Sequence, residues 1–125
     1  MWREMKINGI HHCSMKCTPA ELPDVRRLYC DALGLPVVHE WPEGIMLDTG
    51  RGLLEVFTNG PGSHETGAIR HIAFAVDDAA ACAETVRKAG YQVFLGPKAI
   101  SEPYHAIVAF CYGPLGEQVE FFQTI

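Results

Sequence analysis

Hydrophobic and polar residues alternate along most of the chain with a period of two, which is typical of half-buried β-strands. Glycine-rich stretches separate several of the alternating segments, and Gly50-Arg51-Gly52, which lacks a following helix, is interpreted as a hairpin turn. Eight strands are therefore predicted, at Ile10 to Cys17, Val37 to Trp41, Ile45 to Asp48, Leu53 to Thr58, Arg70 to Val76, Gln92 to Leu95, Ala106 to Cys111 and Gln118 to Gln123.

Two segments have helical spacing instead. Thr18-Pro19-Ala20-Glu21 is a capping box with proline at the first helical position, and it predicts a helix that ends at Gly34. A second helix is expected from about Asp78 to Ala89, where Asp77 or Asp78 is the cap and Gly90 the stop. The order strand, helix and three strands thus occurs twice, which predicts an α+β fold of two tandem βαβββ modules.

The two halves of the chain match at individual residues. His71 lies 59 positions after His12, and Glu120 lies 65 positions after Glu55, as expected for a repeat with small insertions. We therefore expect one domain, residues 1–125, built of module 7–58 and module 68–124, which are joined by loop 59–67.

Each repeated histidine occupies the less apolar side of its predicted strand. His12 shares that side with Ser14 and Lys16, and the residues on the side of His71 are small alanines. The more apolar sides are expected to pack on the helices. We therefore expect both histidines to line a cavity.

The repeated glutamates lie among apolar neighbours, where an unpaired carboxylate costs several kcal/mol. Two imidazoles and two carboxylates at matching repeat positions predict one mononuclear metal site, made by His12, Glu55, His71 and Glu120. This donor set suits Zn, Ni, Co, Mn or Fe. We expect the cavity wall to include Leu53, Phe57, Phe122, Trp41 and Met46.

The remaining chemical candidates are expected to have structural or solvent-exposed roles. His11 is expected to point away from His12, because neighbours in a strand face opposite sides. His39, His64 and His105 have no repeat partner and are expected at the surface or the cavity rim. Glu117 is expected to be a solvated charge beside the last turn.

Composition limits the partners. The chain has 125 residues, of which 48% are hydrophobic and 20% are charged, and its net charge is −5. It has no run of lysine and arginine and no apolar run of 18 residues, so neither nucleic acid nor a membrane is an expected partner. A cytoplasmic location is expected.

Several stretches are similar to the vicinal oxygen chelate superfamily, the group of glyoxalase I, bleomycin-resistance proteins and extradiol dioxygenases. These stretches are His12-Cys13-Ser14-Met15-Lys16-Cys17, Leu28-Tyr29-Cys30-Asp31-Ala32-Leu33-Gly34-Leu35, His71-Ile72-Ala73-Phe74-Ala75-Val76-Asp77-Asp78 and Gly113-Pro114-Leu115-Gly116-Glu117-Gln118-Val119-Glu120-Phe121. The resemblance implies sheets that curl around a metal, helices on the outside, and the same four metal ligands.

Within that superfamily the chain most resembles glyoxalase I. Glu55 occupies a position that extradiol dioxygenases leave without a ligand and where methylmalonyl-CoA epimerases tend to have glutamine. Lys16 and Asn59 match positions that contact glutathione in glyoxalase I, although lysine replaces the usual arginine. The resemblance thus implies one divalent ion, with Ni or Zn favoured, and glutathione or another thiol as co-substrate.

The implied reaction is proton transfer next to a carbonyl through a metal-chelated enediolate, for example on the hemithioacetal of methylglyoxal. Glu120 is expected to be the principal base, and Glu55 the second base or a permanent ligand. Ser14, Phe57 and Phe122 join Lys16 and Asn59 as expected substrate contacts.

Two alternative functions stay open at this point. One is a methylmalonyl-CoA epimerase-like racemase, and the other is a metal-free binding or resistance protein for a small molecule. We expect a homodimer. The two modules pair either within one chain or across the dimer, and in the second case His12 and Glu55 of one subunit meet the other two ligands of its partner.

Overall fold

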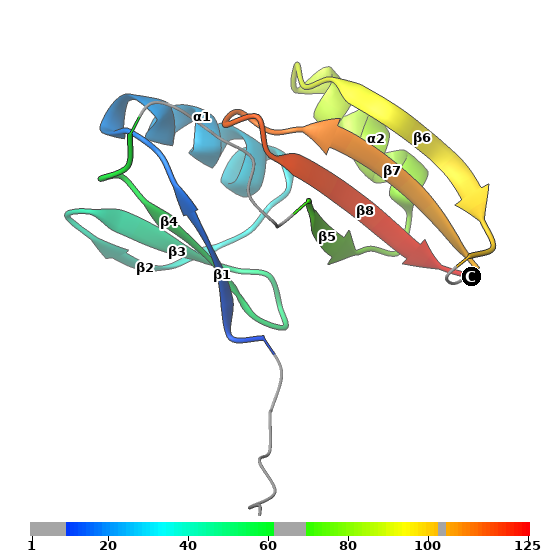
Figure 1. The fold of residues 1–125 in the computed structure, drawn as a ribbon, viewed down its shortest axis with the longest axis horizontal. Helices are drawn as coiled ribbons and strands as arrows, with labels where there is room; N and C mark the ends of the chain where they lie inside the picture. Colours follow the sequence, from blue (N-terminus) through cyan, green and yellow to red (C-terminus); the bar gives the residue numbers. More distant parts are fainter. Residues whose placement is uncertain (1–9, 62–69, 103–104) are drawn as a thin grey trace, which may run out of the picture.

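The structure, a computed structural model, describes residues 10–61, 70–102 and 105–125. His64 and most of the predicted connecting loop lie outside these residues. The strands are β1 His12–Lys16, β2 Val37–Trp41, β3 Gly44–Asp48, β4 Leu53–Phe57, β5 Ile72–Ala75, β6 Val93–Ile100, β7 Ala106–Tyr112 and β8 Gln118–Thr124. The helical elements are a 3₁₀ turn at Pro19–Glu21, α1 at Leu22–Arg26, a π-helical turn at Arg27–Ala32 and α2 at Ala79–Lys88 (Figure 1).

The strands form two four-stranded mixed sheets, with the orders β1-β4-β3-β2 and β5-β8-β7-β6 (Figure 1). In each sheet the strand before the helix pairs in parallel with the last strand of the module, and the other pairings are antiparallel. This confirms the predicted α+β class and its two βαβββ units.

All eight predicted strands are present, and they differ from prediction mainly at their ends. The largest difference is in β6, which was predicted to end at Leu95 but continues through Gly96 and Pro97 to Ile100. The register of β6 with β7 shifts twice, between Val93 and Leu95 and again between Leu95 and Lys98. These irregularities explain why the alternation stops at Leu95 although the strand does not.

The first helix begins as predicted but is not uniform. Thr18 and Glu21 form both bonds of the capping box. The chain then passes from a 3₁₀ turn through α1 into the π-helical turn, where the Leu33 N–H donates to the Leu28 carbonyl over 2.9 Å. It ends at Gly34, whose φ of +74° is one that glycine adopts without a Cβ penalty.

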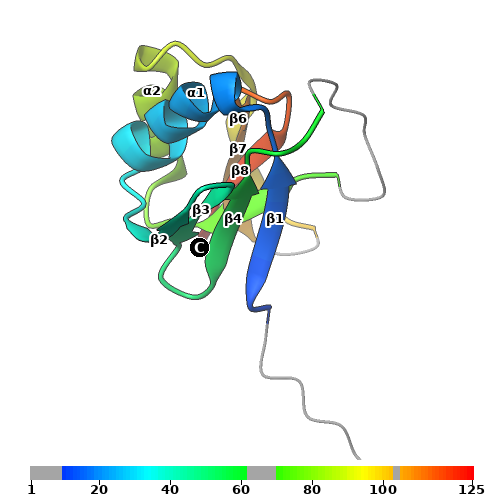
Figure 2. The ribbon, with the colours of Figure 1, turned by 90° about the vertical axis from the view of Figure 1, so that its left-hand side faces the viewer.

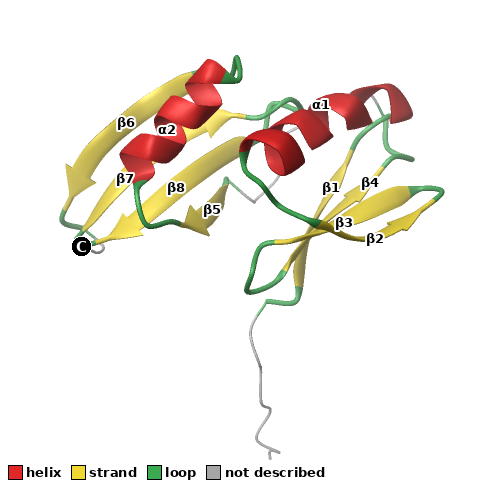
Figure 3. Ribbon diagram, turned by 180° about the vertical axis from the view of Figure 1, so that it is seen from behind, coloured by secondary structure: helices red, strands yellow, loops and turns green. Residues whose placement is uncertain are grey.

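The second helix has the predicted caps. Asp78 is extended, and its side chain accepts a hydrogen bond from the Ala81 N–H, which would otherwise be unpaired at the start of α2. Gly90, with a φ of +98°, follows the helix end. α1 and α2 lie together on one side of the molecule, and α2 also contacts the π-helical turn (Figures 2 and 3).

One hydrophobic cluster joins both sheets and the helical segments. It contains Val25, Leu28 and Tyr29 from the first helical segment, together with residues of both sheets such as Leu54 and Phe121. Cys13, Met15, Ile72, Phe74 and Val76 pack against it, as the alternation predicts for the apolar sides of β1 and β5. The opposite face of each sheet, which we call its open face, carries the polar and small residues of those strands.

A partly buried polar contact links the two halves at the edge of this core. Tyr29 is fully buried, and its hydroxyl donates to Oε2 of Glu117 over 2.8 Å. The other carboxylate oxygen, Oε1, accepts the Leu115 N–H, also over 2.8 Å. Burial, together with the Glu117 carboxylate, raises the pKa of the Tyr29 phenol above its ordinary value. The expectation of a solvated Glu117 was therefore wrong.

Removing the Tyr29 hydroxyl is expected to destabilise the fold. Tyr29→Phe should lower the free energy of unfolding by about 1.5–3 kcal/mol, the usual contribution of a hydrogen bond to a charged group. A tyrosine with a raised pKa stabilises fully below pH ~10, and that stabilisation is lost as pH rises further, because only the unfolded chain ionises there. Urea unfolding at pH 7 and above pH 10 measures both effects. Tyr112→Phe, at an exposed ring, is the matched control. Equal losses in the two variants would contradict this account.

Among the described residues, no helix is long and apolar enough to cross a lipid bilayer.

Candidate metal centre

The first half of the predicted site lies on the open face of the β1-β4-β3-β2 sheet. Nε2 of His12 is 3.6 Å from Oε1 of Glu55. Ser14 is the register partner of Glu55 on one side, and Met46 is its partner on the other. The His12 side chain is 40% exposed, whereas that of Glu55 is 13% exposed, so the carboxylate lies deeper than the ring.

The second half has the same construction on the β5-β8-β7-β6 sheet. Nε2 of His71 is 3.1 Å from Oε1 of Glu120. Ala73 takes the place of Ser14 as the parallel partner of the glutamate, so in both sheets the histidine lies two residues before that partner. Glu120 is the buried charged residue of the described chain, at 7% exposure. The repeat seen in the sequence is therefore a repeat of geometry.

The spacing within the two pairs can be compared with that of two ligands of one metal ion. Two ligands that each lie about 2.1 Å from one ion, at angles between a right angle and the tetrahedral angle, are about 3.0–3.4 Å apart. The His71–Glu120 distance of 3.1 Å falls in that range, and the His12–Glu55 distance of 3.6 Å is slightly longer. Imidazole and carboxylate donors together suit a divalent transition ion.

Within one chain the two halves stay separate. Among residues 10–61, 70–102 and 105–125, no group of three or more histidine, cysteine, aspartate or glutamate side chains is close enough to hold one metal ion. The predicted set of His12, Glu55, His71 and Glu120 is thus two pairs on two sheets rather than one cluster.

The predicted substrate contacts are divided between the sheets in the same way. Ser14 and Lys16 lie in β1, and Phe57, the register partner of Lys16, lies in β4. Phe122 lies in β8, two residues after Glu120, beside Ala75 of β5. Asn59 is exposed beyond β4, and its Nδ2 donates to Oε2 of Glu43 over 2.9 Å.

Aromatic rings border the first pair. The Trp41 ring stacks on His39, with centroids 5.3 Å apart, and meets Phe57 edge-on at 5.6 Å. It also lies against Gly44, where an added Cβ would be 2.6 Å from the indole and 2.6 Å from the Val56 carbonyl oxygen. Only glycine therefore fits at position 44, beside the Trp41 ring.

A second group of rings, which the sequence did not predict, borders the other pair. Phe110 is the register partner of Glu120 and meets the His71 ring edge-on, with centroids 5.3 Å apart. Phe94 lies 5.7 Å from Phe110 and stacks on Tyr112 at 4.2 Å. The alternation along β7 already places Phe110 and Tyr112 on one side of that strand, which is the signal that could have found these two rings; Phe94 lies on the neighbouring strand β6.

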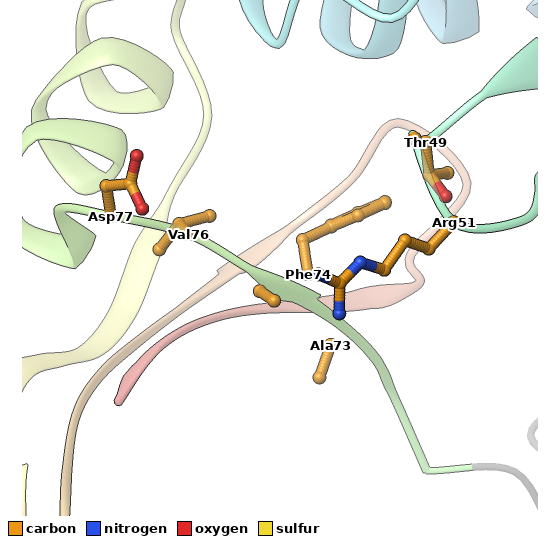
Figure 4. Close-up of a pocket in the computed structure, with 8 residues that line it drawn as sticks. Thr49, Arg51, Ala73, Phe74, Val76 and Asp77 are labelled. Carbon is orange, nitrogen blue, oxygen red and sulfur yellow. The ribbon is translucent and has the colours of Figure 1, made fainter. Parts of the chain in front are cut away.

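A cavity of about 580 Å³ lies between the β3–β4 turn and β5 (Figure 4). The turn contributes Thr49, Gly50 and Arg51, and the Arg51 side chain extends toward Ala73 and Phe74 of β5 (Figure 4). The predicted hairpin turn is present, with the Gly50 N–H bound to Oδ1 of Asp48 over 2.8 Å. Its approach to β5 was not predictable, because nothing local in the sequence reports a contact between modules.

Comparisons with known proteins agree with this architecture. The profile described as "Glyoxalase/Bleomycin resistance protein/Dioxygenase superfamily" matches residues 9–121. No curated protein matches the chain. A glyoxalase family protein from Enterococcus faecalis is 20% identical, with a TM-score of 0.75 over 94% of this chain and 99% of that one. A lactoylglutathione lyase from Agrobacterium tumefaciens is 18% identical, with a TM-score of 0.70 over 94% and 95%. At sequence identities this low, the structural likeness shows a shared fold and no more.

Proposed function

Because the chain belongs to the glyoxalase/bleomycin resistance protein/dioxygenase superfamily, we propose that it is a glyoxalase I-like metal-dependent lyase or isomerase. Its reaction moves a proton at a carbon next to a carbonyl, on the hemithioacetal of methylglyoxal or a similar compound. One observation carries the proposal: the chain presents two His–Glu pairs of equal register, and the 3.1 Å between His71 and Glu120 is the spacing of two ligands of one metal ion.

The proposed site is completed by a second copy of the chain. Each open face carries one pair, and the histidines, at 40% and 35% side-chain exposure, remain accessible on it. Two copies that place unlike open faces together would bring His12 and Glu55 of one subunit to His71 and Glu120 of the partner subunit. A twofold dimer forms two such sites at once.

The residues of the chain have separate tasks in this reaction. A bound divalent ion, Ni or Zn by preference, supplies Lewis acidity that favours negative charge on the substrate oxygens. Glu120 takes the proton from the reacting carbon on a carboxylate oxygen and returns it to the neighbouring carbon, so no proton is gained or lost overall. Glu55 is the second base or a permanent ligand.

Substrate contacts follow from the same faces. Phe57 and Phe122 provide apolar surface beside the two glutamates, and Ser14 offers a hydroxyl in register with Glu55. Lys16, on the open face that carries His12 and Glu55, provides the positive charge for a carboxylate of glutathione or another thiol. Nδ2 of Asn59 donates to Glu43, and the remaining hydrogen-bonding groups of the Asn59 amide contact the substrate.

An activity screen tests the proposal. The protein is stripped of metal, reloaded with Ni²⁺ or Zn²⁺, and assayed with methylglyoxal hemithioacetals of glutathione and of other thiols, beside methylmalonyl-CoA. Metal-dependent isomerisation of a hemithioacetal is the expected result. Turnover of methylmalonyl-CoA alone would make the chain an epimerase. A loaded protein that turns over neither substrate would favour a binding module.

A further inference from the structure

The residue before β1 makes a specific contact with a proposed metal ligand. Nδ1 of His11 lies 2.9 Å from Nδ1 of His12, and the two rings are nearly perpendicular, with an interplanar angle of 85° and centroids 5.2 Å apart. The expectation that His11 points away from His12 was wrong, because His11 precedes the strand and does not follow its alternation. Both rings are exposed.

A hydrogen bond between two Nδ1 atoms requires that one of them carries a proton and the other does not. The opposite ring nitrogen of His12, Nε2, faces the Glu55 carboxylate at 3.6 Å. A histidine that binds a metal through Nε2 carries its proton on Nδ1, and a partner that accepts this proton fixes both the tautomer and the ring orientation. His11 is in the position to be that partner.

An imidazole suits this position in both states of the site. Without metal, the tautomer of His12 that directs Nε2–H at Glu55 requires Nδ1 of His12 to accept from an Nδ1–H of His11. With Nε2 bound to a metal, Nδ1–H of His12 donates, and Nδ1 of His11 accepts. His11 changes between these two tautomers by exchanging its ring proton with solvent. A carboxylate or carbonyl, which only accepts, matches only the second state.

The second half of the site lacks this contact. Arg70 occupies the position before His71, and its guanidinium has no acceptor atom. The His71 ring meets the edge of Phe110 instead. The two halves are therefore alike in their ligands and different in what surrounds each histidine.

We propose that His11 is a positioning residue, which holds the His12 ring and its tautomer for metal binding. This inference rests on the proposed function, because it assigns a task at the same site. His11 does not touch substrate or the reacting carbon in this proposal. It acts only through His12.

Zn²⁺ affinity is the first readout. Competition titration with a chelating dye is expected to show an affinity about 10–100-fold weaker for His11→Ala than for the native chain, the usual effect of losing such a partner. His11→Gln should recover most of the affinity, because its amide both donates and accepts. His105→Ala removes an exposed histidine beside Ala106, which pairs with Thr124 at the end of the sheet away from the Phe110–Glu120 pair, and this variant should bind Zn²⁺ as the native chain does. Unchanged affinity in His11→Ala would overturn the inference.

Ring ¹⁵N chemical shifts provide a second readout that does not depend on turnover. Adding Zn²⁺ to the native protein should place the proton of His12 on Nδ1 and convert Nδ1 of His11 to an unprotonated nitrogen. His11 shifts that do not respond to Zn²⁺ would overturn the inference while leaving the metal site intact. A native chain that binds no Zn²⁺ would overturn the proposed function as well.

Discussion

Replacing Glu120 with glutamine is expected to lower the turnover of a hemithioacetal by about 10²–10⁴-fold, the range that a positioned general base contributes. Glutamine keeps the shape of the side chain but accepts no proton. Glu120 suits the role because it is 7% exposed, lies between Ala73 and Phe110 in the sheet, and has Oε1 3.1 Å from Nε2 of His71.

The measurement is kcat at a metal content that is confirmed for each preparation, since Glu120 is also a proposed ligand. Glu84→Gln, on the exposed surface of α2, is the matched control and should leave kcat unchanged. Near-native turnover of Glu120→Gln with full metal would rule Glu120 out as the base. The base would then be Glu55, and Glu55→Gln would show the loss.

Removing either His–Glu pair is expected to weaken metal binding severely. Native protein with Zn²⁺ at ~100 times its Kd should be stabilised by about 2.7 kcal/mol, and a variant whose Kd is ~100-fold weaker should retain about 0.4 kcal/mol. The two variants are His12→Ala with Glu55→Ala, and His71→Ala with Glu120→Ala. Each leaves a single pair, which supplies two protein ligands instead of four.

Thermal unfolding with and without Zn²⁺ measures this loss. The metal-free Tm of each variant must also be compared with that of the native chain, because both glutamates are partly buried. A variant that folds and still gains the full stabilisation from Zn²⁺ would show that the removed pair is not part of the site.

Local patterns were sufficient to predict much of the fold and the pairing of a histidine with a glutamate on each sheet. Period-two alternation placed His12, Ser14 and Lys16 on one side of β1, and the parallel register with β4 puts Glu55 beside Ser14 on that same face. The capping box at Thr18 and the cap at Asp78 marked where both helical segments begin. These features depend on residues that are only a few positions apart, and a local sequence pattern is sufficient to predict such features.

Contacts between distant segments were not predictable in this way. Tyr29 and Glu117 are 88 positions apart, and the length of the last turn alone does not show that the Glu117 carboxylate is directed into the core. The approach of Arg51 to β5, where both line one cavity, was not predictable for the same reason: the two segments are far apart in the sequence. His11 was misplaced for a different reason, because strand alternation was extended one residue beyond the start of β1.

The arrangement of the two half-sites also lies beyond local pattern. The repeat predicted which four residues belong together, but the same repeat is compatible with pairing inside one chain and with pairing across a dimer. Packing of both helical segments in one core fixes how the two sheets of a chain sit relative to each other, and it leaves His12 and His71 on separate open faces.

Mixing the two double variants tests whether the metal site is shared between two subunits. At a Zn²⁺ concentration about ten times the native Kd, each variant alone should bind almost none. After they are unfolded together and refolded as an equal mixture, half of the dimers should contain one chain of each kind, and each of these should have one intact site. A shared site gives the mixture about a quarter of the native Zn²⁺ content. A mixture that binds no Zn²⁺, although the native chain treated in the same way binds it fully, would show that the site is not shared between subunits.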